Sequence, residues 1–185
     1  MALDAFLFFK DKGAAGDDIQ GETQDKFMRT NFGGNIPFDL QAWSFGLSQD
    51  VKIGSASGGV GAGKVTFEQF KVTKAIDKSS PSFFLTCCNG GHFGTVSLMI
   101  RKSGTDPKQS GGIYLQFDFK LVFVSNIAWS HADPAPTEEI TFDYGALKIT
   151  YKKQDPKGIL VAPPDGGQAM WSRILNNTDF DGTPT

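Results

Sequence analysis

In the segment from Ile113 to Val124, apolar side chains alternate with Tyr114, Gln116, Asp118 and Lys120, and no other feature of the chain constrains its fold as strongly. The apolar positions are Ile113, Leu115, Phe117, Phe119, Leu121 and Phe123. Successive side chains of a β-strand point to opposite faces, so a period of two predicts a strand with one face in an apolar core. We therefore expect a mainly β protein built from antiparallel strands.

Other segments have the same character. Further strands are expected at 3–10, 38–49, 64–76, 93–102 and 137–152. In the last of these, the apolar set changes parity after Tyr144, and Gly145 lies at the change, where a β-bulge would redirect the side chains. About six strands and one short helix predict a closed or nearly closed antiparallel β-barrel.

Several of these segments are apolar on both faces. The first places Leu3, Ala5, Leu7 and Phe9 on one face, and Phe6 and Phe8 on the other. A small barrel has only one interior, so a second apolar face needs another partner, which is either a helix or another protomer. One short helix cannot cover all the two-sided strands, which favours oligomerisation.

The expected helix runs from about Ser80 to Asn89. Ser80 can cap its N-terminus, Pro81 suits the first helical position, and Gly90 can end it. Its apolar residues leave little polar surface, so we expect the helix to pack against one wall or mouth of the barrel. The residues expected to make this contact are Phe83, Phe84, Cys87 and Cys88.

Composition excludes several classes of function. Lys and Arg (18) nearly balance Asp and Glu (20), which argues against nucleic acid as the main partner. The start, MALDAFLFFKDK, lacks the basic region and cleavage site of a secretory signal, and no apolar run is long enough to span a membrane. We expect synthesis in the cytoplasm, no membrane insertion, and any export by a route without a cleaved signal.

The stretch Gly58-Gly59-Val60-Gly61-Ala62-Gly63-Lys64 has the spacing of a phosphate-binding loop. Such a loop needs a Ser or Thr after the lysine and a helix behind it, whereas here Val65 follows and the next residues resemble a strand. We interpret the stretch as a loop that makes protein contacts.

The sequence also lacks a recognisable catalytic or metal-binding motif. Cys87, Cys88 and His92 lack the spacing of a metal site, and the other histidine, His131, stands alone in the sequence. The neighbouring Glu138 and Glu139 are expected to be solvated. We therefore predict no catalytic residues, no metal and no cofactor.

Five segments, taken in order, resemble the haemolysin-coregulated protein family, the tube subunit of type VI secretion. The N-terminal DAFLFF resembles its first strand, and residues 18–25 (DIQGETQD) resemble its I-x-G-E-S-x-D segment. Residues 43–46 (WSFG) lie where the family has an aromatic-serine stretch. Residues 74–81 (KAIDKSSP) are similar to its K-x-x-D-K-x-S-P segment, and Pro136 to Gly145 to its P-x-E-x-h-x-h-x-h-G pattern. The resemblance covers roughly residues 2–152.

The length of 185 residues and the lack of an interdomain linker predict a single domain over residues 1–185, with 154–185 a less regular tail rich in Gly, Pro and Asp. The resemblance implies homohexameric rings that stack into a tube inside a contractile sheath, beneath a spike protein, with effector proteins in the lumen. A six-fold ring needs one patch that binds a different patch on the neighbour. For the weaker contacts between rings we expect a glycine-rich loop, comprising Gly54, Ser55, Ser57, Gly58, Gly59, Gly61 and Gly63.

Two alternatives remain open from the sequence. The chain could be the tube protein of a phage tail or of an extracellular contractile particle, which shares the architecture. It could instead be a monomeric β-barrel that binds small apolar ligands. Light scattering distinguishes the monomeric barrel from a tube subunit, because a measured particle mass near 20 kDa would exclude the tube subunit.

Overall fold

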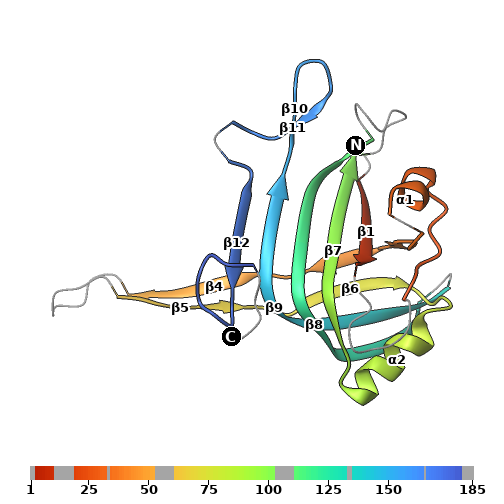
Figure 1. The fold of residues 1–185 in the computed structure, drawn as a ribbon. Helices are drawn as coiled ribbons and strands as arrows, with labels where there is room; N and C mark the ends of the chain where they lie inside the picture. Colours follow the sequence, from red (N-terminus) through yellow and green to blue (C-terminus); the bar gives the residue numbers. More distant parts are fainter. Residues whose placement is uncertain are drawn as a thin grey trace.

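The computed structural model describes residues 3–10, 19–32, 34–52, 61–102, 111–132, 135–164 and 166–180 (Figure 1). The strands are β1 (Leu3–Phe9), β2 (Phe38–Asp39), β3 (Ala42–Ser44), β4 (Leu47–Lys52), β5 (Gly61–Phe67), β6 (Phe70–Ala75), β7 (His92–Lys102), β8 (Ile113–Ala132), β9 (Ala135–Tyr151), β10 (Lys153–Gln154), β11 (Leu160–Val161) and β12 (Gln168–Ser172). The helices are α1 (Lys26–Asn31) and α2 (Ser80–Asn89). The predicted mainly β fold is confirmed, with one helix more than expected.

The main sheet has the strand order β2-β1-β7-β8-β9-β6-β3, and its neighbouring strands pair antiparallel. One edge of the long β9 is shared, because its first half pairs with β6 and its second half pairs with β12. β8 continues to Ala132, beyond its predicted end at Val124. The C-terminal segment, expected to be less regular, contributes β12 to this sheet. Over the part of the chain that is described, no helix is both long and apolar enough to cross a membrane.

The two edges of the main sheet are joined by a short stretch of chain. β2 and β3 stand at opposite ends of the strand order, yet only Leu40 and Gln41 lie between them in sequence. The Leu40 N–H donates to the Ala5 carbonyl of β1 at 2.9 Å, and the Gln41 N–H donates to the Thr73 carbonyl of β6 at 2.9 Å. The sheet therefore curls until its edges meet at this stretch, as expected for a nearly closed barrel.

The side-chain parity of β8 and β9 changes where these strands lie side by side. On β9, Tyr144 and Leu147 both belong to the interior core, so the parity change predicted at Gly145 is present. On β8, Leu121 adopts φ 52°, and the core residue that follows Phe119 is Val122. The prediction that Leu121 and Phe123 face the core is therefore wrong, because the left-handed backbone at Leu121 turns the next residues over.

Two apolar clusters lie on opposite faces of β1. Leu7 and Phe9 belong to the barrel interior, whereas Phe6 packs with Met28 of α1 and Met99 of β7 in a smaller outer cluster. The second face of β1 is therefore covered by α1, a helix that was not predicted. The two-sided pattern of this strand consequently does not require another protomer.

The helix α2 begins one residue earlier than its sequence indicated. Ser79, rather than Ser80, occupies the N-cap position, and its side chain makes no capping hydrogen bond. The end of the helix agrees with expectation, because Gly90 adopts φ 69° at the C-cap, a conformation that favours glycine.

The strands β4 and β5 form a separate two-stranded sheet, which we call the arm. Figure 1 shows the arm extending away from the barrel. The pairs Val51↔Ala62 and Lys52↔Gly61 lie in its outer part, so residues 61–63, expected in a loop, belong to β5.

Candidate interaction surfaces and the networks that hold them

A buried ionic network holds the start of α2 against β9. Lys74 of β6 is 1% exposed and Glu138 of β9 is fully buried, and the Lys74 Nζ lies 2.7 Å from a Glu138 oxygen. Lys74 also contacts the carboxylate of Asp77 at 2.9 Å, and the Ser80 hydroxyl donates to Glu138 at 2.7 Å. The prediction that Glu138 is solvated is wrong, because these donors replace water around its carboxylate.

This network reaches the surface through Trp129. Its indole N–H donates to Glu138 at 3.1 Å, yet half of the residue is exposed. The Trp129 ring lies 6.2 Å from that of Phe84 on α2, which is 51% exposed, and Leu85 beside it is 52% exposed. We call Phe84, Leu85 and Trp129 the α2 patch. It is an apolar surface supported from beneath by buried charges.

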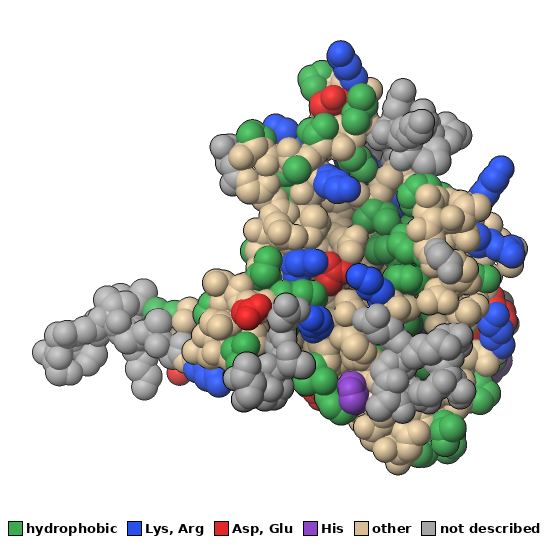
Figure 2. All heavy atoms as spheres, viewed as in Figure 1, with side chains coloured by type: hydrophobic (Ala, Val, Ile, Leu, Met, Phe, Trp, Pro, Cys, Tyr) green, Lys and Arg blue, Asp and Glu red, His purple; other side chains and the backbone are tan. Residues whose placement is uncertain are grey.

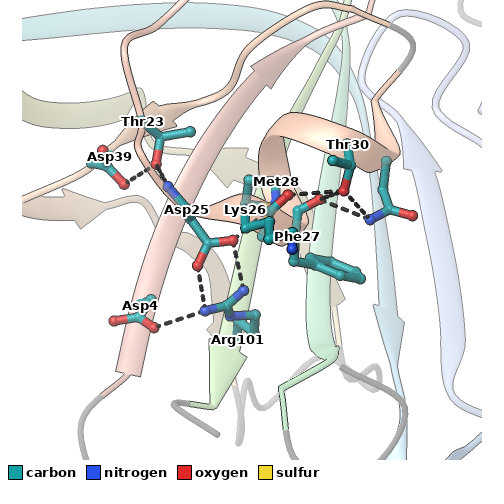
Figure 3. Close-up of polar contacts among 10 residues, drawn as sticks. Asp4, Thr23, Asp25, Lys26, Phe27, Met28, Thr30, Asp39 and Arg101 are labelled. Atoms are coloured by element: carbon teal, nitrogen blue, oxygen red, sulfur yellow. Dashed lines mark hydrogen bonds and ion pairs between the residues drawn. The ribbon is translucent and has the colours of Figure 1, made fainter. Parts of the chain in front are cut away.

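A second network fastens α1 to the barrel (Figure 3). The Arg101 guanidinium of β7 donates to both carboxylate oxygens of Asp25, at 2.9 and 2.7 Å. Asp25 is also the N-cap of α1 and accepts from the Met28 N–H at 2.9 Å. Burial alone would raise the pKa of Asp25, but the hydrogen bonds from Met28 and Arg101 and the charge of Arg101 outweigh it and hold that pKa below its ordinary value.

Replacing Asp25 by asparagine tests this ion pair, because asparagine keeps the N-cap acceptor and removes the charge. We expect Asp25→Asn to lower the free energy of unfolding at pH 7 by about 1–3 kcal/mol. A carboxyl whose folded pKa is depressed contributes stability above its unfolded pKa and loses it as pH falls through the folded pKa. The gap between the two proteins should therefore close below about pH 4. Urea unfolding at pH 7 and pH 3 measures it, and a gap that does not change with pH would contradict the assignment.

The chain that leads into α1 is fixed by close packing. A side chain at Gly21 would place its Cβ 2.2 Å from the Pro37 carbonyl oxygen, which belongs to the backbone and cannot rotate away. The Thr23 hydroxyl donates to Asp39 at 2.8 Å (Figure 3). This segment therefore has a structural role at each of four positions, Ile19, Gly21, Thr23 and Asp25. The sequence signal that was missed is the short polar Asp25, followed after Lys26 by the apolar Phe27 and Met28, which is typical of an N-cap.

A groove lies between the arm and the part of the main sheet where β12 pairs with the second half of β9. It has a volume of about 650 Å³ and is lined by Leu47, Gln49, Lys64, Val65, Phe67, Leu147, Ile149, Ala169, Met170, Trp171 and Asn176. Most of these side chains are apolar, and Leu47 on the arm is 57% exposed. In Figure 2 the arm stands away from the body of the molecule, with hydrophobic side chains visible along it. The groove is an apolar surface of a different shape from the α2 patch.

The residues expected to form sites fall into three groups. Gly54, Ser55, Ser57, Gly58 and Gly59 lie outside the described residues. Gly61 and Gly63 lie in β5, and the continuation of this strand to Phe67 removes the helix that a phosphate-binding loop requires.

The third group lies on α2, where Phe83 is fully buried and Cys87 packs against the core. Phe84 and Cys88 are exposed, because they lie on the next face of the helix, so the expected packing through all four residues is wrong for these two. Within the described ranges, His, Cys, Asp and Glu form no group of three or more that could hold a metal ion.

Comparison with solved structures places this fold among type VI secretion proteins. A structure described as a type six secretion system protein covers 96% of this chain and all of its own, with a TM-score of 0.78 at 22% identity. Hcp1 from Salmonella typhimurium covers 97% of this chain and all of its own, with a TM-score of 0.68 at 21% identity. At these identities the likeness establishes the fold.

The sequence comparisons establish the family. Residues 7–151 match the family described as "Type VI secretion system effector, Hcp". The chain is also 32% identical over 173 residues to Protein hcp1 of Pseudomonas aeruginosa, covering 92% of this chain and 94% of the relative. This chain belongs to the Hcp family of type VI secretion. The resemblance noted from sequence motifs is confirmed.

Proposed function

We propose that this chain is a structural subunit of the type VI secretion tube, assembled as a homohexameric ring. The observation that carries the proposal is a pair of separate apolar surfaces, the groove beside the arm and the α2 patch. The arm and α2 lie on different sides of the barrel (Figure 1). A closed ring of identical subunits needs two different complementary surfaces on each subunit. Family membership supports the same assignment.

In this proposal the work of the protein is mechanical. Rings stack into a tube, contraction of a sheath expels it beneath a spike protein, and the lumen carries effector proteins. The subunit is made in the cytoplasm and leaves through the machine without a cleaved signal. It needs no catalytic residue or cofactor.

The mass of the purified protein in solution tests the ring directly. A hexamer of 20.0 kDa chains is expected to dominate in native mass spectrometry, and ring-shaped particles should appear in negative-stain images. A particle of one chain at micromolar concentration would exclude the tube assignment and favour a monomeric barrel.

For the contacts between rings we propose the glycine-rich segment 54–63, which lies between β4 and β5 in the sequence. Replacing Gly58, Gly59 and Gly61 by glutamate is expected to leave rings intact and to reduce the stacked fraction by about tenfold, because like charges would meet at each ring junction. Stacks are counted in negative-stain images at matched concentration. Glycine-to-serine changes at the same positions serve as the control. Loss of the rings themselves would show that the loop acts within the ring instead.

A further inference from the structure

The chain leaves β12 through a turn that lies at the root of the arm. Arg173 is the first residue of this turn, and its backbone N–H donates to the Gly145 carbonyl at 2.8 Å. A side chain at Gly145 would place its Cβ 2.8 Å from the Ile174 Cδ1, so the absence of a side chain there makes room for the turn. The turn is therefore seated on β9 at the point where the parity of that strand changes.

The Arg173 side chain extends from this turn to the arm. One guanidinium nitrogen donates to the Tyr144 carbonyl at 2.7 Å. The guanidinium carbon lies 4.9 Å from the centre of the Tyr144 ring and 5.5 Å from that of Phe67, the last residue of β5. Its side chain is 28% exposed. A cation placed over two aromatic faces and partly removed from water attracts both rings.

The arm is not hydrogen-bonded into the main sheet in the part of the chain that is described. Among the described residues, β4 and β5 pair only with each other, and an isolated two-stranded hairpin is marginal in water. The Tyr144 hydroxyl donates to the Glu68 carbonyl at 3.2 Å, and the Phe67 and Tyr144 rings lie 6.3 Å apart. These contacts and Arg173 converge on Phe67 and Glu68, where the arm meets the barrel.

We propose that Arg173 is a positioning residue that couples the C-terminal turn to the arm and sets the direction in which the arm leaves the barrel. The C-terminal segment thereby controls the groove, because Phe67 of the arm and Trp171 of β12 both line it. The consequence for assembly rests on the proposed tube function. The coupling itself concerns one chain and is measured separately.

Hydrogen exchange of the intact protein, read by mass spectrometry, tests the coupling. Arg173→Ala is expected to speed exchange in the arm (residues 47–52 and 61–67) by about tenfold, while exchange in β7 and β8 stays unchanged. Arg173→Lys, which keeps the charge but loses the planar fork, should give an intermediate rate. Arg29→Ala serves as the matched control, because Arg29 lies on α1 and contacts Gln24. Each variant is compared in the same assembly state.

A second variant separates coupling from a general loss of stability. Phe67→Leu keeps an apolar side chain but removes the aromatic face, and it should speed arm exchange as Arg173→Ala does. Combining the two changes should have less effect than the sum of the single changes, because both remove the contact between Arg173 and Phe67. Unchanged arm exchange in Arg173→Ala, or fully additive effects, would overturn the proposal. Faster arm exchange with undiminished ring formation would support the coupling and contradict the role of the arm in assembly.

Discussion

Replacing Glu138 by alanine is expected to lower the free energy of unfolding by about 3–5 kcal/mol, which is a large share of the stability of a domain. The change leaves the ammonium group of Lys74, 1% exposed, without the carboxylate that lies 2.7 Å away. The Ser80 hydroxyl and the Trp129 indole N–H lose their acceptor at the same time. Urea unfolding at pH 7, followed by circular dichroism, gives the midpoint and the slope.

The neighbouring Glu139 provides a matched control. It is the next residue of β9, is half-buried, and points to the other face of the sheet. Glu139→Ala should change the free energy of unfolding by no more than about 0.5 kcal/mol. The double variant Lys74→Met with Glu138→Leu removes both charges and should recover most of the loss. Equal losses in the two alanine variants would show that the buried charge is not the cause.

The second large effect is expected for Phe83→Ala, at about 3–5 kcal/mol. The Phe83 side chain is fully buried, and its ring lies 5.4 Å from that of Phe9 and 5.7 Å from that of Phe38. Removing it leaves a cavity under α2 that the surrounding rings of the barrel can close only in part. Urea unfolding again measures the loss.

Phe84 is the natural comparison, because it is adjacent on the same helix and is 51% exposed. Phe84→Ala should cost less than about 1 kcal/mol of folding stability. If the α2 patch takes part in the ring, this variant should instead weaken assembly, seen as a lower hexamer fraction on dilution. A loss of folding stability as large as that of Phe83→Ala would contradict the observed burial.

Local patterns in the sequence predicted the local features well. The parity change at Gly145 and the end of α2 at Gly90 depend on residues that lie next to each other in the chain, so both could be read directly. The left-handed backbone at Leu121 could not, because nothing in a leucine marks it and only its long-range packing stabilises it.

Contacts between residues that are distant in the sequence were the main features that could not be predicted. Lys74 and Glu138 are each ordinary surface residues by type, and only the pairing of β6 with β9 brings them together away from water. Arg101 and Asp25 meet for the same reason, through the packing of α1 on β7. The family motifs marked three of these four positions, Lys74, Glu138 and Asp25, but only the structure shows why such residues are needed there. The direction of the arm depends on Arg173, which lies beyond the motifs altogether.

The pairing of β1 with β7 has a consequence for how the chain matures during translation. Leu3 pairs with Lys102 and Phe9 with Val96, so until the ribosome has made more than half of the chain the first strand can pair only with the two-residue strand β2. At about 5–20 residues per second, the aromatic β1 waits on the order of 5–20 s before its long partner β7 has been made. The nascent chain must therefore be kept from contacting other nascent chains of the same protein during this interval. Its solubility in the cell consequently depends on the speed of synthesis as well as on the finished fold.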